Sequence, residues 1–123
     1  MSGFDNVVSH YLRVWNIVDE AERRKAIDEV FAENVRYVDP LADVEGRDAL
    51  NALIGAVHQQ FPGLVFTAGG PADGHHDQGP FTWHLGPADP DGGEPLVVGF
   101  DVAELDAAGR IRRVVGFLDR VPA

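Results

Sequence analysis

The chain has 123 residues and a formal net charge of −10, from 20 acidic and 10 basic residues. This length fits one domain, and the charge disfavours nucleic acid as a partner. The absence of cysteine excludes disulfides, thiolate catalysis and cysteine-based zinc sites. No apolar stretch reaches the ~18 residues needed to cross a bilayer, and no basic segment precedes an apolar run at the N-terminus. We therefore expect one cytoplasmic domain over residues 1–123, with no membrane partner.

Helices are expected mainly in the first half of the chain. Apolar residues recur at spacings of three and four over residues 3–18, which predicts a helix with one buried face. Further helices are predicted over 20–33 and 47–61, the last ended by Pro62-Gly63. The basic run that starts at Arg23 is interpreted as solvated surface.

The second half has the pattern of a sheet joined by Gly- and Pro-rich turns. Gly79-Pro80 is expected to mark a bulge or bend, and residues 41–46 are expected to form a loop. Helices followed by consecutive hairpins predict an α+β fold, with three N-terminal-weighted helices packed on a curved, mostly antiparallel sheet. The predicted strands are 35–39, 64–68, 75–85, 96–105 and 111–119.

The last two predicted strands are apolar on both faces. Val97 alternates with Val98 and Phe100 in one strand, and Val115 alternates with Val114 in the other. Three helices cannot cover both faces of the sheet. We therefore expect a homodimer formed through the outer sheet face.

Three polar residues stand on apolar faces and are candidates for catalysis. Tyr11 lies within the buried stripe of the first helix, Asp39 ends the first strand, and Asp101 lies inside an apolar strand. A carboxylate in such a place tends to be protonated, paired or functional. Structural roles remain open: a core hydroxyl for Tyr11, a turn cap for Asp39, and pairing with an arginine or backbone amides for Asp101.

Histidines are a second group of candidates. If His84 faces inward it would form an acid–base pair with Asp101, but a one-residue shift in register would place it on the surface or at an interface. His75 and His76 are adjacent on a predicted strand, so they point to opposite faces and are poorly placed to share a metal ion. We expect no metal and no cofactor.

Two pairs of segments resemble the SnoaL-like members of the nuclear transport factor 2-like superfamily. They are Tyr37-Val38-Asp39-Pro40 with Glu45-Gly46-Arg47-Asp48-Ala49-Leu50, and Gly99-Phe100-Asp101-Val102 with Asp106-Ala107-Ala108-Gly109-Arg110-Ile111. The resemblance covers nearly the whole chain. It implies a cone-like fold with a deep pocket, often dimeric through the sheet. The superfamily includes ketosteroid isomerases, polyketide cyclases and epoxide hydrolases.

The resemblance to ketosteroid isomerases also implies roles for residues. Those enzymes have a Tyr five residues before an Asn in the first helix, as Tyr11 and Asn16 stand here. Their base is the Asp of an Asp-Pro pair, which matches Asp39, and a second Asp late in the sheet matches Asp101. By this comparison Asp39 is the base, and Tyr11 and Asp101 donate hydrogen bonds to the enolate oxygen.

The favoured function is a cofactor-independent isomerase or cyclase that does acid–base chemistry on a hydrophobic carbonyl compound. It requires Tyr11, Asp39 and Asp101 to line one cavity. The alternatives are a non-catalytic binding protein for an apolar ligand and an epoxide hydrolase-type enzyme. Aromatic residues expected to line the pocket are Trp15, Tyr37, Phe61 and Phe117.

Overall fold

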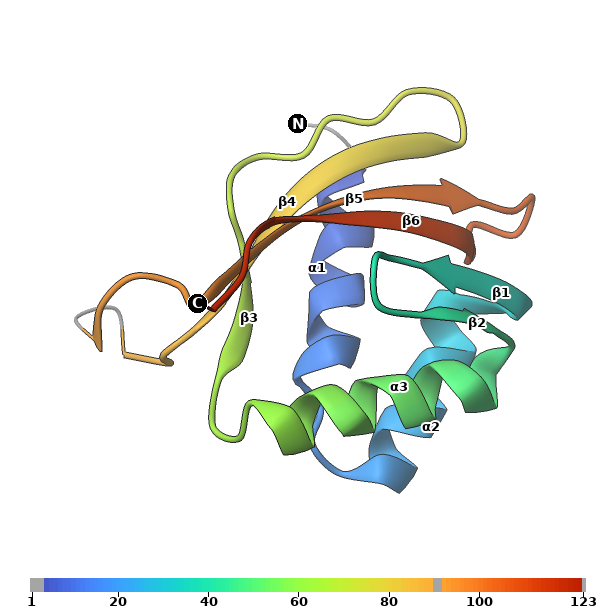
Figure 1. Ribbon diagram of the computed structural model, residues 1–123. Coiled ribbons are helices and arrows are strands. Elements are labelled where there is room, and N and C mark those ends of the chain that lie inside the picture. Colours follow the sequence, from blue (N-terminus) through green and yellow to red (C-terminus); the bar gives the residue numbers. More distant parts are fainter. Residues whose placement is uncertain (1–3, 90–91, 123) are drawn as a thin grey trace.

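The computed structural model describes residues 4–89 and 92–122, which form three helices and six strands (Figure 1). The helices are α1 (Phe4–Asn16), α2 (Glu20–Val30) and α3 (Arg47–Gln60). The strands are β1 (Phe31–Val38), β2 (Asp43–Glu45), β3 (Val65–Ala68), β4 (Gln78–Gly86), β5 (Val97–Leu105) and β6 (Ile111–Arg120). The predicted α+β fold is confirmed.

The helices begin and end close to the predicted positions, with one informative difference. The first predicted residue of the first helix, Gly3, lies outside the described residues, as do 90 and 91 of the long loop before β5. Asp19 caps α2 by accepting a hydrogen bond from the Glu22 amide at 2.8 Å. The prediction that α2 continues to residue 33 is wrong, because Phe31 has an extended backbone and begins β1. The spacing of four residues between Ile27 and Phe31 fits a helical face, so the sequence pattern does not reveal that α2 ends at Val30.

The sheet has the strand order β2-β1-β6-β5-β4-β3. Neighbouring strands are antiparallel except β1 and β6, which are parallel. The prediction of a loop over 41–46 is wrong for residues 43–45, which form β2. Asp43 there accepts two hydrogen bonds from the Arg36 side chain of β1. The ladder between β1 and β2 thus gives a short polar segment an extended conformation.

The expected irregularity at Gly79-Pro80 is absent from the pairing of β4 with β5. Gly79 and Pro80 lie opposite Ala103 and Val102 in an unbroken register. Pro80 is tolerated because β3 pairs only with the later part of β4, so no ladder hydrogen bond is required of Pro80 on that side. Register shifts occur instead in the pairing of β6 with β5 and with β1.

All three helices lie on one side of the curved sheet, and α1 lies against its concave face (Figure 1). Asn16 joins the end of α1 to the free edge of β3: its amide donates to the Phe66 carbonyl at 2.8 Å and accepts from the Phe66 amide at 2.7 Å. This contact covers part of an edge strand that would otherwise be unpaired.

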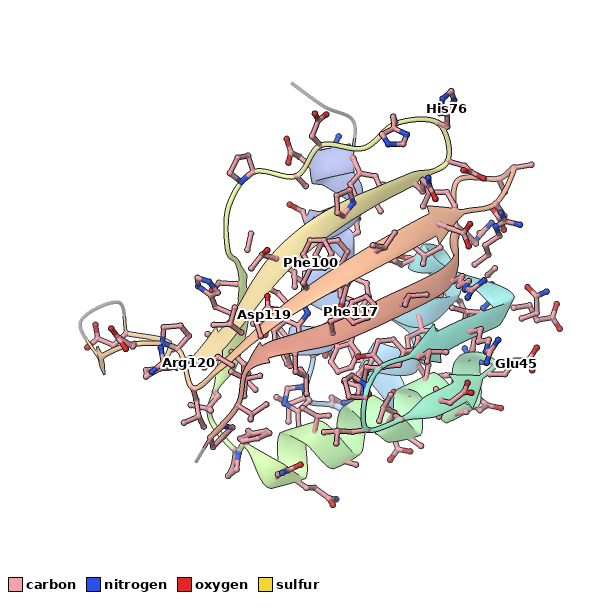
Figure 2. All side chains as sticks on the ribbon, turned by 45° about the horizontal axis from the view of Figure 1, so that its top comes forward. Glu45, His76, Phe100, Phe117, Asp119 and Arg120 are labelled. Carbon is pink, nitrogen blue, oxygen red and sulfur yellow. The ribbon has the colours of Figure 1, made fainter. Side chains whose placement is uncertain are left out.

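None of the three helices within residues 4–89 and 92–122 covers the outer face of the sheet (Figure 1). Phe100 and Phe117 lie on this face side by side, in register on β5 and β6 (Figure 2). Phe117 is 52% exposed. Alternation along the same strands adds Val98, Val102 and Val115 to this face, all of them partly buried. We call these five residues the outer apolar patch.

Candidate active site

A cavity of about 540 Å³ lies between α1, α3 and the concave face of the sheet. Aromatic rings and aliphatic side chains make up most of its wall. The aromatic lining residues are Tyr11, Trp15, Tyr37, Phe61, Phe66 and Trp83. The others are Asp39, Leu41, Leu53, Val57, Gln60, Leu85, Val97, Leu118, Val121 and Pro122. A concave apolar site with few polar groups is typical of small-molecule binding.

The Tyr11 hydroxyl lies on this wall and donates a hydrogen bond to Asp101 Oδ2 at 2.9 Å. The Trp83 side chain forms a second hydrogen bond to the same carboxyl group. Asp101 itself is only 1% exposed and does not line the cavity. The carboxyl group therefore lies one layer behind the wall, where it contacts Tyr11 and Trp83.

The burial of Asp101 changes its acidity. Loss of solvation raises the pKa of Asp101 to about 6, although the hydrogen bonds from Tyr11 and Trp83 oppose this rise and the nearby charge of Asp39 adds to it. Burial and the charge of Asp101 also raise the pKa of the Tyr11 hydroxyl well above its usual value, so Tyr11 keeps its proton. The pair thus combines a carboxyl group that titrates near neutral pH with a hydroxyl group that stays protonated.

Two glycines make room for this arrangement. Gly99 lies opposite Trp83 across β4 and β5, and a Cβ atom there would overlap the indole ring. Gly116 lies opposite Asp101, and a Cβ atom there would come within 2.5 Å of Asp101 Oδ1 and 3.4 Å of Asp39 Cβ. Asp39 and Asp101 therefore approach each other across the bare backbone of β6.

Asp39 also lines the cavity, where several donors surround its carboxylate. Its Oδ2 accepts from the Tyr37 hydroxyl at 2.7 Å, and its Oδ1 accepts from the amides of Leu41 and Ala42 at 2.8 Å each. The expected turn-capping role of Asp39 is therefore observed together with its place on the cavity wall. The turn before β2 holds the carboxylate at the site.

Three candidate site residues, Asp101, His84 and Phe117, do not line the cavity. For His84 this decides between the two orientations that the sequence left open. Asp101 was expected to line the cavity with Tyr11 and Asp39, but it lies behind Tyr11 because its strand position points into the packed layer between α1 and the sheet. His84 and Phe117 do not line the cavity. His84 alternates with the lining residues Trp83 and Leu85, and Phe117 precedes the lining residue Leu118, so both have the opposite orientation.

The structure brings Trp15, Tyr37 and Phe61 to the cavity wall, as their positions on predicted apolar faces indicated. Sequence reasoning did not identify Trp83 as part of the site. Its position opposite Gly99 would have been the clue, since a bulky ring beside a glycine commonly indicates packing across a strand pair. Val121 and Pro122, which follow β6, also line the cavity. Their place on the wall depends on where β6 ends, and no local sequence pattern predicts it.

Other kinds of site have little support in the part of the chain that the structure describes. No three His, Asp or Glu side chains there come together in a way that would hold a metal ion. His75 and His76 lie next to each other, outside the strands, with their ring centroids 5.6 Å apart. No helix over residues 4–89 or 92–122 is long and apolar enough to cross a membrane.

A curved sheet wrapped around helices, with a largely apolar cavity that Asp39 lines and Asp101 adjoins behind Tyr11, defines a class of α+β small-molecule pocket proteins. The SnoaL-like domain model matches residues 8–114, and the chain belongs to this family. No curated protein shows significant similarity to the sequence.

Solved structures show the same fold. A SnoaL-like family protein from Agrobacterium tumefaciens is 43% identical, with a TM-score of 0.85, over 93% of this chain and 95% of that one. A protein with a ketosteroid isomerase-like fold from Catenulispora acidiphila, crystallised with trimethylamine, is 15% identical, with a TM-score of 0.72, over 94% and 85%. An NTF2-like protein from Exiguobacterium is 21% identical, with a TM-score of 0.66, over 92% and 98%.

Proposed function

We propose that this protein is a cofactor-independent enzyme of the isomerase or cyclase type, which enolises a hydrophobic carbonyl compound in the cavity. The observation that supports this most directly is the Tyr11 hydroxyl on the cavity wall, bonded to the buried Asp101 at 2.9 Å, with Asp39 on the same wall. A base and a hydrogen-bond donor are the two groups that enolisation needs. The SnoaL-like relative from Agrobacterium tumefaciens carries a provisional isomerase name, which supports the same class.

In this proposal Asp39 removes a proton from the carbon next to the substrate carbonyl. The carbonyl oxygen accepts a hydrogen bond from Tyr11, which stabilises the negative charge that develops there. Asp39 then returns the proton to another carbon in an isomerisation. In a cyclisation the enolate carbon attacks a second carbonyl, and the alkoxide oxygen that forms takes the proton back from Asp39. A largely apolar wall strengthens both electrostatic effects because it excludes water.

Because Asp101 does not line the cavity, the version of this function in which all three side chains contact the substrate is ruled out. In the revised proposal Asp101 acts only through Tyr11. When Asp101 is protonated, its carboxyl group no longer requires a hydrogen bond from Tyr11. The Tyr11 hydroxyl can then donate its hydrogen bond to the substrate carbonyl. When Asp101 is ionised, its carboxylate holds the Tyr11 proton. Because the pKa of Asp101 is about 6, we expect kcat/KM to fall as the pH rises above this value and to be flat over the same range in Asp101→Asn.

The test is exchange of α-protons for deuterium, followed by NMR, on two probes: α-tetralone and a β,γ-unsaturated 3-ketosteroid. Exchange reports enolisation whatever the final product is. We expect the parent protein to exchange at least one probe, Asp39→Asn to lose nearly all of this activity, and Tyr11→Phe to lose roughly a hundredfold. Asp43→Asn is the matched control, since Asp43 is exposed on β2 and does not line the cavity.

Absence of exchange with both probes would count against enolisation and favour the alternative of a non-catalytic binding protein. Exchange that survives in Asp39→Asn would rule out Asp39 as the base. The epoxide hydrolase alternative has less support, because its Asp–Arg–Asp arrangement needs an arginine, and no arginine lines the cavity among the described residues.

We also propose that the outer apolar patch packs against a second copy of the chain. Phe117 is 52% exposed and lies beside Phe100, with three valines around them. Contiguous exposed apolar surface in the middle of a sheet is typical of an interaction site, and a self-complementary patch needs only a two-fold axis to be buried.

A further inference from the structure

The hydroxyl hydrogen atoms of the two tyrosines on the cavity wall are used in hydrogen bonds to carboxyl groups. A tyrosine hydroxyl has one proton and two lone pairs. Tyr11 gives its proton to Asp101, and Tyr37 gives its proton to Asp39. In this arrangement both hydroxyl groups present lone pairs to the cavity, and Tyr11 becomes a donor to a ligand only in the state in which Asp101 carries the proton. Among the described lining side chains, the remaining donors are the Gln60 amide and the buried indole N–H of Trp15, which has no hydrogen-bond partner.

The charge on the wall is also of one sign. Asp39 is the one ionisable acid among the described lining residues, and no Arg, Lys or His lies among them. Asp101 adds a second carboxyl group directly behind Tyr11. A bound anion would face these groups with no opposite charge to compensate.

Aromatic rings complete the wall. Trp15 packs 5.6 Å from Tyr37 and 5.3 Å from Phe66, and Phe66 packs 5.4 Å from Trp83, measured between ring centroids. The negative face of an aromatic ring attracts a cation within about 6 Å, most strongly where water is excluded. A continuous group of rings beside a carboxylate is the combination that favours a positively charged apolar group.

From these three features we infer that the cavity selects a positively charged apolar molecule, such as an alkyl- or arylammonium compound, over neutral and anionic molecules of the same shape. The inference rests on the proposed function in taking this cavity as the ligand site, and it narrows the substrate to a carbonyl compound that also carries an ammonium group. Asp39 would then lie next to both the ammonium group and the carbon that loses its proton.

Three probes of nearly the same shape separate charge from size: benzyltrimethylammonium, its neutral carbon analogue neopentylbenzene, and the anion benzylsulfonate. Tryptophan fluorescence reports binding directly, because the chain has two Trp residues and both Trp15 and Trp83 line the cavity. Calorimetry provides a second readout that does not depend on quenching.

We expect benzyltrimethylammonium to bind at least tenfold more tightly than neopentylbenzene, and benzylsulfonate not to bind. Asp39→Asn should reduce the preference for the cation at least fivefold. Asp43→Asn is the decisive control, because it changes the net charge of −10 by the same amount without touching the cavity. Equal loss of preference in both variants would assign the effect to the overall charge and overturn the inference.

The outcome is independent of catalysis. If neopentylbenzene binds as tightly as the cation while α-proton exchange is observed, the inference is wrong and the proposed function stands. If the cation is selected but neither ketone exchanges, the inference stands and enolisation of these ketones fails. If none of the three probes binds, the cavity is not selective for cations and the inference is overturned.

Discussion

Asp101 is a buried carboxyl group whose side-chain partners are Tyr11 and Trp83 rather than a cation. Removing a carboxylate from water without an opposite charge is costly, so the neutral form is favoured. This explains why hydrogen bonds from two donors do not bring the pKa below its usual value. A protein would retain such a group where a proton is needed near neutral pH, which is the proposed role.

The raised pKa of Asp101 predicts a specific dependence of stability on pH. The folded state binds the proton more tightly than the unfolded state, so this residue contributes a loss of stability as the pH rises from about 4 through about 6. The free energy of unfolding of the parent minus that of Asp101→Asn should therefore become more negative with rising pH. We expect it to change by about 2 kcal/mol between about pH 4.5 and about pH 7.5.

Urea denaturation of both proteins at the two pH values measures this difference. The Asn side chain keeps an oxygen that accepts from Tyr11, so the variant isolates the charge. A difference between the two proteins that does not change with pH would show that Asp101 is ionised in both states over this range.

At the scale of elements, Arg23 holds the helical layer together. It belongs to α2 and is 2% exposed, which contradicts the expectation that its basic run is solvated surface. Its Nε donates to Asn51 Oδ1 of α3 at 2.6 Å, and its Nη1 donates to the Ile17 carbonyl after α1 at 2.9 Å. One guanidinium group therefore joins all three helices through neutral acceptors.

We predict that Arg23→Ala lowers the free energy of unfolding by about 3 kcal/mol, because it leaves buried acceptors on Asn51 and Ile17 without a donor. Arg24→Ala is the neighbouring control. Arg24 forms exposed ion pairs with Asp28 and Asp48, and its loss should cost less than about 1 kcal/mol. Thermal or urea denaturation of the two variants provides the comparison, and equal effects would refute the joining role of Arg23.

At the scale of the whole molecule, the outer apolar patch determines the expected assembly. The helices cover one face of the sheet and leave the other to solvent or to a partner (Figure 2). The proposed dimer would bury Phe117 and its neighbours and leave the cavity on the opposite face of the sheet. The proposed catalysis and the proposed assembly therefore involve different faces of the sheet, and substitutions can test them separately.

We expect the parent protein to sediment with twice the chain mass of 13.3 kDa, and Phe117→Asp to sediment as a folded monomer. Val18→Asp is the matched control, because Val18 is the same kind of exposed apolar residue but follows α1, away from the sheet. Sedimentation equilibrium with circular dichroism separates dissociation from unfolding. A monomeric parent, or a dimer unaffected by Phe117→Asp, would refute this interface.

The sequence alone determined the three helices, five of the six strands, the α+β class and the apolar faces, because helical and strand periodicity are local properties of side-chain spacing. It also identified Tyr11, Asp39, Trp15, Tyr37 and Phe61, which stand on those faces and line the cavity. The family resemblance rested on short segments around Asp39 and Asp101 and is confirmed by the match over residues 8–114.

Only the tertiary structure determined how deeply these side chains are buried and which way they point. Periodicity assigns Asp101 to an inner face, but whether it reaches the cavity or stops behind Tyr11 depends on how closely α1 approaches β5. The orientation of His84 and Phe117 depends on strand register, because a shift of one residue reverses the orientation of every side chain in the strand. Arg23 is charged and near other charges in the sequence, and its burial follows from acceptors that α1 and α3 bring to it from distant positions.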